Sequence, residues 1–384
     1  MIAEPPLDAP DEDWAVWADA MQQLGDPRGE LIALAKHPDQ LAKHVKLHAD
    51  RLLGPTLGRM FRKGTLRTTW RRAQPDVVEL RLDDKANGPQ LLAQLIQSPL
   101  APRMRGLAIA AVPPRNSQLD LTQTLGALGE IPRSWTSLAL IDDRARAVDH
   151  MITRDFRPHQ NLVDFGALDT LWPAVQHLEE LTLVVADPAQ LRLAPLELPE
   201  LRSFTLHCLY WTEGTGALLA NARWPKLANV ELRLVEDFTL NEPSDRHAYR
   251  PVYASETASV DEAYESTPRR GYVDRGGDLA RLFESFEALP LERLAVTSFA
   301  DGNLVLGLLE NYALPSLVHL DLSDSALTAS DLARLANNPL LLQLDELVLE
   351  RVTAPTAKAL VGAVEVRHSC SPRAPSYRYV VGWE

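Results

Sequence analysis

The chain is 384 residues long and 46% hydrophobic, which is enough apolar material to bury a large core, as one elongated body or as two ordinary domains. This composition excludes a disordered chain. Charges interrupt its apolar stretches within about ten residues, whereas a membrane-spanning helix needs roughly 20 apolar residues in a row, so we expect no such helix. The two cysteines are too few for a disulfide framework or a four-cysteine zinc site.

The net charge of −13 is distributed unevenly along the chain. Residues 1–35 carry eight acids against Arg28, whereas residues 36–72 carry ten Lys or Arg against Asp39 and Asp50. The first 13 residues hold five acids and no Lys or Arg, unlike the basic start of a signal peptide, so we expect a cytoplasmic protein. The basic segment is either a docking patch for acidic surfaces or nucleic acid, or a solvated helix face against the protein's own acidic body. We favour the second explanation.

The segment at residues 13–34 has the pattern of two helices joined by a tight turn. Gly25 suits the position just after a helix, Asp26 suits an N-cap, and Pro27 suits the first turn of the next helix. We therefore predict a small all-helical N-terminal domain over residues 1–72, which also caps the body that follows.

A strand phrase recurs from about residue 75 onward, with apolar residues at its first, fourth and sixth positions. The alternation at its end points apolar side chains to one face of a strand and leaves the residues between them on the other face. The clearest copies lie at residues 178–183, 201–206, 227–232, 291–296, 317–322 and 344–349, with weaker copies centred on Leu80, Leu107 and Leu138 and a truncated copy at 364–366.

The middle apolar residues of these copies are spaced by 27, 31, 43, 23, 26, 64, 26 and 27 residues. Helix-like patterns lie between the copies, as at residues 89–96 and 330–336, where Ser330 suits an N-cap. One strand and one helix cannot bury both apolar faces alone, but stacked units can. We therefore predict an α/β solenoid over residues 73–368, with a parallel sheet on the concave side and helices on the convex side, and a tail at 369–384.

Several spacings fall within the length of a leucine-rich repeat, and the phrase resembles the ribonuclease-inhibitor-like class of such repeats. The positions after the last strand residue hold Val185, Cys208, Val235 and Asp324, so the inner asparagine ladder is not expected and the repeats should be irregular. Ala18-Asp19 and the turn at residues 25–30 resemble the repeat-companion domain that precedes leucine-rich repeats in many bacterial proteins. These resemblances imply the architecture of a bacterial leucine-rich-repeat protein more than an activity.

The spacing between Val230 and Leu294 exceeds one repeat. The excess, residues 236–277, is polar and holds four of the eight tyrosines. Long insertions in repeat proteins lie on one face and often bind, so Tyr249 and Tyr253 are candidate anchors. A disordered excursion is the alternative.

The sequence holds no nucleophile-elbow, P-loop or dinucleotide motif. His44 and His48 are one helical turn apart, but the neighbouring Lys43 and Lys46 disfavour a cation, so we interpret them as part of a solvated face rather than a zinc site. Cys208 follows His207 on a strand, where neighbouring side chains point to opposite faces, so we interpret it as a core residue. We expect a non-catalytic protein with no metal or organic cofactor.

The residues between the buried leucines face out of the sheet on its concave side. They are small and apolar in the early strands and charged in the later ones, so we expect a divided groove that seats a helix or loop of another protein. Simple surface exposure of Ala and Val is the alternative. The candidate partner-binding residues are Ala108, Ala139, Ile141, Val184, Thr205, His207, Glu231, Arg233, Arg293, His319 and Asp321, with Tyr249 and Tyr253 of the insertion.

The sequence therefore favours a protein-binding scaffold that uses the concave face of a solenoid. The alternative is a regulatory or substrate-recognition subunit of a bacterial enzyme or defence complex that contacts nucleic acid through residues 36–72. We expect nucleic-acid binding to be weak at most, because the net charge of −13 opposes phosphate and no aromatic stacking platform interleaves the arginines. No membrane partner is expected.

Overall fold

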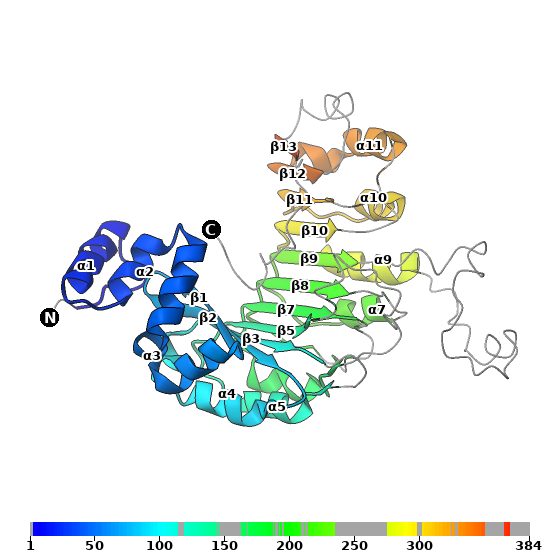
Figure 1. Ribbon diagram of the computed structural model, residues 1–384. Coiled ribbons are helices and arrows are strands. Elements are labelled where there is room, and N and C mark those ends of the chain that lie inside the picture. Colours follow the sequence, from blue (N-terminus) through cyan, green and yellow to red (C-terminus); the bar gives the residue numbers. More distant parts are fainter. Residues whose placement is uncertain are drawn as a thin grey trace, which may run out of the picture.

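Three helices precede the sheet in the computed structural model, namely α1 (Asp11–Gln23), α2 (Arg28–Leu34) and α3 (Pro38–Lys63) (Figure 1). The structure describes residues 3–113, 119–143, 145, 163–166, 168–186, 188, 191, 193, 196–208, 211, 214–234, 275–297, 302–323, 325, 327, 329–349 and 365–368. α1 buries Trp14 and Trp17, whose rings meet edge to face with their centroids 5.6 Å apart. α3 is kinked at His48 and Gly54, and it ends at Gly64, whose φ of 76° lies in the left-handed region.

The turn between α1 and α2 follows the predicted pattern, and its residues make structural contacts. Gly25 has a φ of 66°. Asp26 Oδ1 accepts a hydrogen bond from the main-chain N–H of Arg28 at 3.0 Å, and the carboxylate also accepts from the Arg28 guanidinium at 2.8 Å. A Cβ on Gly29 would lie 2.6 Å from the carbonyl oxygen of Ala18, so only glycine allows α2 to approach α1 this closely.

The sheet has eleven strands in the order β1-β2-β3-β5-β7-β8-β9-β10-β11-β12-β13. Their bounds are β1 Leu66–Arg71, β2 Gln74–Leu82, β3 Gly106–Ala111, β5 Ser137–Asp142, β7 Glu180–Val185, β8 Ser203–Cys208, β9 Asn229–Leu234, β10 Arg293–Thr297, β11 His319–Asp321, β12 Glu346–Leu349 and β13 Glu365–His368. β1 pairs antiparallel with β2, and every later pair of neighbours is parallel. A separate short parallel pair joins β4 (Leu119–Asp120) to β6 (Val163–Asp164).

β1 corrects the prediction that residues 1–72 are all helical. It forms a hairpin with β2, and Arg72 at the turn has a φ of 58°, which is uncommon for a residue other than glycine. The guanidinium of Arg72 donates to the main-chain oxygens of Leu7 at 2.6 Å and Ala9 at 2.7 Å, and its Cζ lies 5.4 Å from the ring centroid of Trp14. Arg72 therefore ties the first hairpin to the N-terminal helices.

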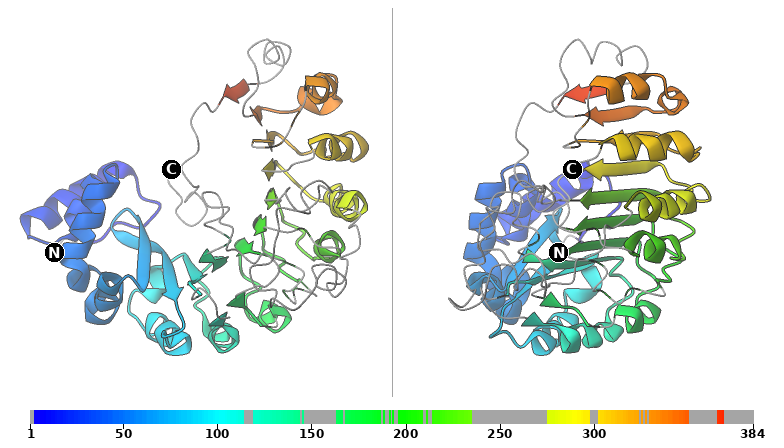
Figure 2. Two further views of the ribbon diagram at one scale, coloured as in Figure 1. Left: turned by 45° about the vertical axis from the view of Figure 1, so that its right-hand side comes forward. Right: turned by 90° about the vertical axis from the view of Figure 1, so that its right-hand side faces the viewer.

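Helices lie along the outer side of the curved sheet, and the strands line its inner side (Figure 2). The later α-helices are α4 (Gly88–Ile96), α5 (Thr122–Gly126), α7 (Thr215–Ala220), α9 (Arg275–Phe286), α10 (Gly302–Asn311) and α11 (Ala329–Ala336). Short 3₁₀ helices occupy Ala101–Arg103, Ala127–Glu130, Leu168–Thr170, Trp172–Ala174 and Pro339–Leu342. The predicted helices at 89–96 and 330–336 are confirmed, although α11 begins at Ala329 and so places Ser330 in its first turn rather than at its N-cap. The arrangement is that of a solenoid-like α/β fold.

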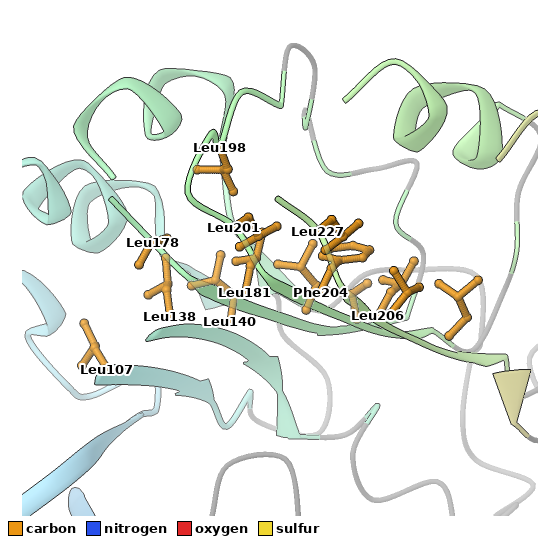
Figure 3. Packing of buried hydrophobic residues seen from close by; sticks show 14 of the residues in the cluster. Leu107, Leu138, Leu140, Leu178, Leu181, Leu198, Leu201, Phe204, Leu206 and Leu227 are labelled. Carbon is orange, nitrogen blue, oxygen red and sulfur yellow. The ribbon is translucent and has the colours of Figure 1, made fainter. Parts of the chain in front are cut away.

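The apolar positions of the strand phrase stack in register between the sheet and the helices (Figure 3). One file, in which each side chain is at most 3% exposed, comprises Leu107, Leu138, Leu181, Phe204, Val230, Leu294, Leu320 and Leu347. Full burial of each such side chain contributes roughly 1.5–3 kcal/mol, so stacking the strands is the main source of stability. Cys208 is 2% exposed in the same core, which confirms its interpretation as a core residue.

The predicted insertion does not interrupt the sheet, because β9 and β10 pair directly with Val230 opposite Leu294. α9 begins at Arg275, so the last residues of the segment 236–277 belong to a helix. β13 confirms the last predicted strand. Tyr249, Tyr253 and the tail at 369–384 lie outside the described residues. Among the helices that the structure describes, none is both long and apolar enough to cross a membrane.

Candidate partner-binding surface

Strand pairing sorts the concave side chains into three rows that run across the strands. The first row comprises Ser137, Glu180, Ser203, Asn229, Arg293, His319 and Glu346. The middle row comprises Ala108, Ala139, Thr182, Thr205, Glu231, Ala295, Asp321 and Val348. The third row comprises Ala110, Ile141, Val184, His207, Arg233 and Thr297. The early strands contribute apolar groups and the later strands charged ones, as predicted.

The apolar half of the concave face is buried, which corrects the prediction that it is open to a partner. The residues Ala108, Ala110, Ala139, Ile141 and Val184 form a cluster, here called the inner cluster, in which no side chain is more than 6% exposed. Ala145, which follows β5 in the chain, packs against this cluster.

The neighbouring Asp143 also reaches the concave side, since its Oδ2 lies 2.8 Å from Nη2 of Arg81 on β2. Residues 143 and 145, which follow β5, therefore lie against the inner face of the sheet. Strand alternation placed these alanines on the correct face, but it contained no sign that the protein itself covers them.

The polar half of the concave face, on strands β8 to β12, holds the charged candidates. Two His–Glu pairs bridge neighbouring strands: His207 Nε2 lies 3.3 Å from Glu231 Oε1, and His319 Nδ1 lies 3.3 Å from Glu346 Oε2. The second contact is close but does not have the alignment of a hydrogen bond. Asp321, on the middle row, accepts hydrogen bonds from its neighbour Ser323.

The remaining candidates on this half differ in exposure. Thr205 is buried at 7%, Arg233 is half-buried, and Arg293 is exposed. Arg293 therefore offers the most accessible cation among the candidate residues.

Arg105 joins the early strands to β7, and it is not among the residues predicted from the sequence. Its Nη1 donates to Glu180 Oε1 at 2.6 Å, and its Nε and Nη2 donate to the carboxylate of Asp76, each at 3.3 Å. Burial opposes the charged form, but the two carboxylates outweigh this effect, so the pKa of Arg105 is raised above its ordinary value. The sequence does mark this place by Gly106, the residue after Arg105. A Cβ at Gly106 would lie 2.7 Å from Cβ of Ser137, so only glycine allows β3 to approach β5 this closely here.

The N-terminal domain corrects the interpretation of His44 as a solvated residue. Its side chain is buried between α3 and α2, with Nε2 2.8 Å from the carbonyl oxygen of Pro27 and Nδ1 3.0 Å from Glu30 Oε2. The ring centroid of His48 lies 4.7 Å away. Among the described residues there is no group of three or more His, Cys, Asp or Glu that could hold a metal ion.

Half of the basic side chains in residues 36–72 are engaged within the protein. Those with a recorded acceptor are Arg51 on Gly25, Arg62 on Asp50, Arg67 on Glu79, Arg71 on Asp76 and Arg72 on Asp11. The contacts with the protein's own groups agree with the favoured explanation, but only Arg51 and Arg62 lie on a helix, because Arg67, Arg71 and Arg72 belong to β1 and its turn. These contacts leave fewer cations to contact phosphate.

No family model and no curated protein matches the chain. Its fold is similar to the crystal structure of a structural-genomics protein from Bacteroides fragilis, with a TM-score of 0.52 and 13% sequence identity. The similarity covers 73% of this chain and 69% of that one. At this level of identity the similarity concerns the fold alone.

Proposed function

We propose that this chain is a leucine-rich-repeat scaffold with an N-terminal companion domain, and that it binds another protein on the polar half of its concave face without catalysing a reaction. The phrase spacing, the parallel inner sheet and the outer helices support the repeat assignment. We place the binding surface on strands β8 to β12, rather than on the whole concave face, because the inner cluster on the earlier strands is buried.

The observation that carries this proposal is the group of charged side chains that strands β8 to β12 present on a rigid ladder of parallel strands, with Arg293 exposed and the others partly exposed. Side chains on neighbouring strands stand about 4.8 Å apart, and the main-chain ladder fixes their spacing before any partner arrives. Charged groups held in this way select a partner by electrostatic complementarity.

Chemical cross-linking of the full-length chain to its captured partner, read by mass spectrometry, tests the proposal. We expect cross-links to fall at the edges of strands β8 to β12, and binding to be lost when Ala295 on the middle row is replaced by Arg. The matched control is Arg223→Gln, because Arg223 lies outside the eleven-stranded sheet and its side chain is 79% exposed. Cross-links confined to the convex helices or the N-terminal domain, with Ala295→Arg binding normally, would overturn the proposal.

A further inference from the structure

Arg293 lies in the first concave row, on strand β10. The strand pairing sets Asn229 of β9 on one side of it and His319 of β11 on the other. Neighbouring strands are about 4.8 Å apart, so groups at these three positions can reach one small anion. Arg293 alternates with the core residues Leu294 and Val296, which are 1% and 2% exposed, so its side chain projects to the concave side.

The acidic side chains of the first and middle rows on β9, β11 and β12 contact other side chains. Glu231 pairs with His207, Asp321 accepts from Ser323, and Glu346 pairs with His319. Because the register puts His319 between Arg293 and Glu346, one whole strand separates that carboxylate from the guanidinium.

Within the part of the chain that the structure describes, the guanidinium of Arg293 is exposed and makes no hydrogen bond or ion pair, while its main-chain N–H donates to Ala228 in the strand ladder. The register places Asn229 next to Arg293, and Asn229 donates one amide N–H to the carbonyl oxygen of Arg202 at 3.4 Å. Among the described residues, the row thus presents a guanidinium and an amide side by side, and no carboxylate forms an ion pair with that guanidinium.

We propose that Arg293 and Asn229 form a carboxylate-binding site that recognises an acidic segment of the partner protein. A guanidinium matches a carboxylate with two parallel hydrogen bonds, and this geometry makes Arg–carboxylate pairs strong and directional. The second N–H of the Asn229 amide supplies a further donor to the same group. This inference rests on the proposed function, because it names the chemistry of the segment that the polar half of the concave face binds.

The test is to pan a random peptide library on the full-length chain and on four variants, Arg293→Gln, Arg293→Lys, Ala295→Arg and Arg223→Gln. We expect the selected peptides to share an Asp or Glu at a fixed position. Fluorescence anisotropy of one labelled peptide should then show a loss of at least about tenfold in affinity with Arg293→Gln, a smaller loss with Arg293→Lys, and no change with Arg223→Gln.

The outcomes separate this inference from the proposed function. Peptides that lose binding with Ala295→Arg but not with Arg293→Gln, or that carry no acidic residue, would overturn the carboxylate site and keep the concave scaffold. Peptides that bind all variants equally, or no selected peptide at all, would overturn both. Circular dichroism checks the fold of each variant, and Val348→Arg on the middle row of β12 replaces Ala295→Arg if that variant does not fold.

Discussion

Replacement of Asp278 by Ala should destabilise the solenoid where α9 packs on α7. The carboxylate is 7% exposed, and it accepts hydrogen bonds from Trp211 Nε1 at 2.9 Å, from the Gly216 N–H at 2.7 Å and from the Ala217 N–H at 3.2 Å. A buried donor left without its acceptor costs roughly 1–3 kcal/mol, and two of these donors belong to the first turn of α7. Allowing for solvent access to the partly buried Ala217, we expect a loss of about 3–5 kcal/mol in the free energy of unfolding.

Urea unfolding followed by circular dichroism and tryptophan fluorescence measures this loss, and hydrogen exchange locates it at α7 and α9. Trp211→Phe removes one of the three donors and should cost less, about 1–2 kcal/mol. Glu200→Ala is the control, because Glu200 pairs with Lys226 on the surface, and such pairs contribute about 0–1 kcal/mol. If Asp278→Ala unfolded at the same urea concentration as Glu200→Ala, the conclusion that Asp278 stabilises the packing of α9 on α7 would be wrong.

Three further predictions follow from the same structure. Ala139→Arg should lower the free energy of unfolding by at least about 3 kcal/mol, because it forces a charge into the inner cluster. Ala295→Arg on the polar half should lower it far less, and thermal unfolding of the two variants makes the comparison. Deleting residues 240–270 should leave the unfolding midpoint almost unchanged, since β9 and β10 already pair directly; loss of cooperative unfolding would refute this. The pKa of Asp26 is lowered, chiefly by its hydrogen bonds from Arg28, so its contribution to stability is complete well above pH 3.8 and lost as the pH falls through the lowered value. The stability difference between the wild type and Asp26→Asn should therefore close in acid, as unfolding curves from pH 7 to pH 2 would show.

The repeated part of the fold could be predicted from the sequence because its cause is local and periodic. Leu181 and Leu183 must alternate with Thr182 if one face of a strand is buried, and the same phrase recurs in each unit. The register of β9 with β10 across the long insertion follows from the same phrase on either side.

The features that the sequence did not reveal all depend on contacts between distant segments. β1 is stabilised by the contacts of Arg72 with residues more than 60 positions earlier. His44 is buried because two acceptors on α2 and its preceding turn face its ring. Ala145 packs against the inner cluster and Asp143 pairs with Arg81 beside it, and no alternation pattern on β3 or β5 encodes these contacts.

Under the proposed function, the same distant contacts affect the cost of binding a partner on the polar half. Arg105 fixes β7 against the early strands, Asp278 fixes α9 against α7, and the two His–Glu pairs hold side chains across neighbouring strands. A partner that docks on this surface therefore orders few protein groups, and the entropic cost of binding is correspondingly small. Because the surface is already in place, substitutions on it should change the dissociation rate of the complex more than its association rate. Arg293→Gln should also lower the association rate, because it removes an exposed charge that guides an acidic partner to the surface. This effect on the association rate should become smaller as salt is added.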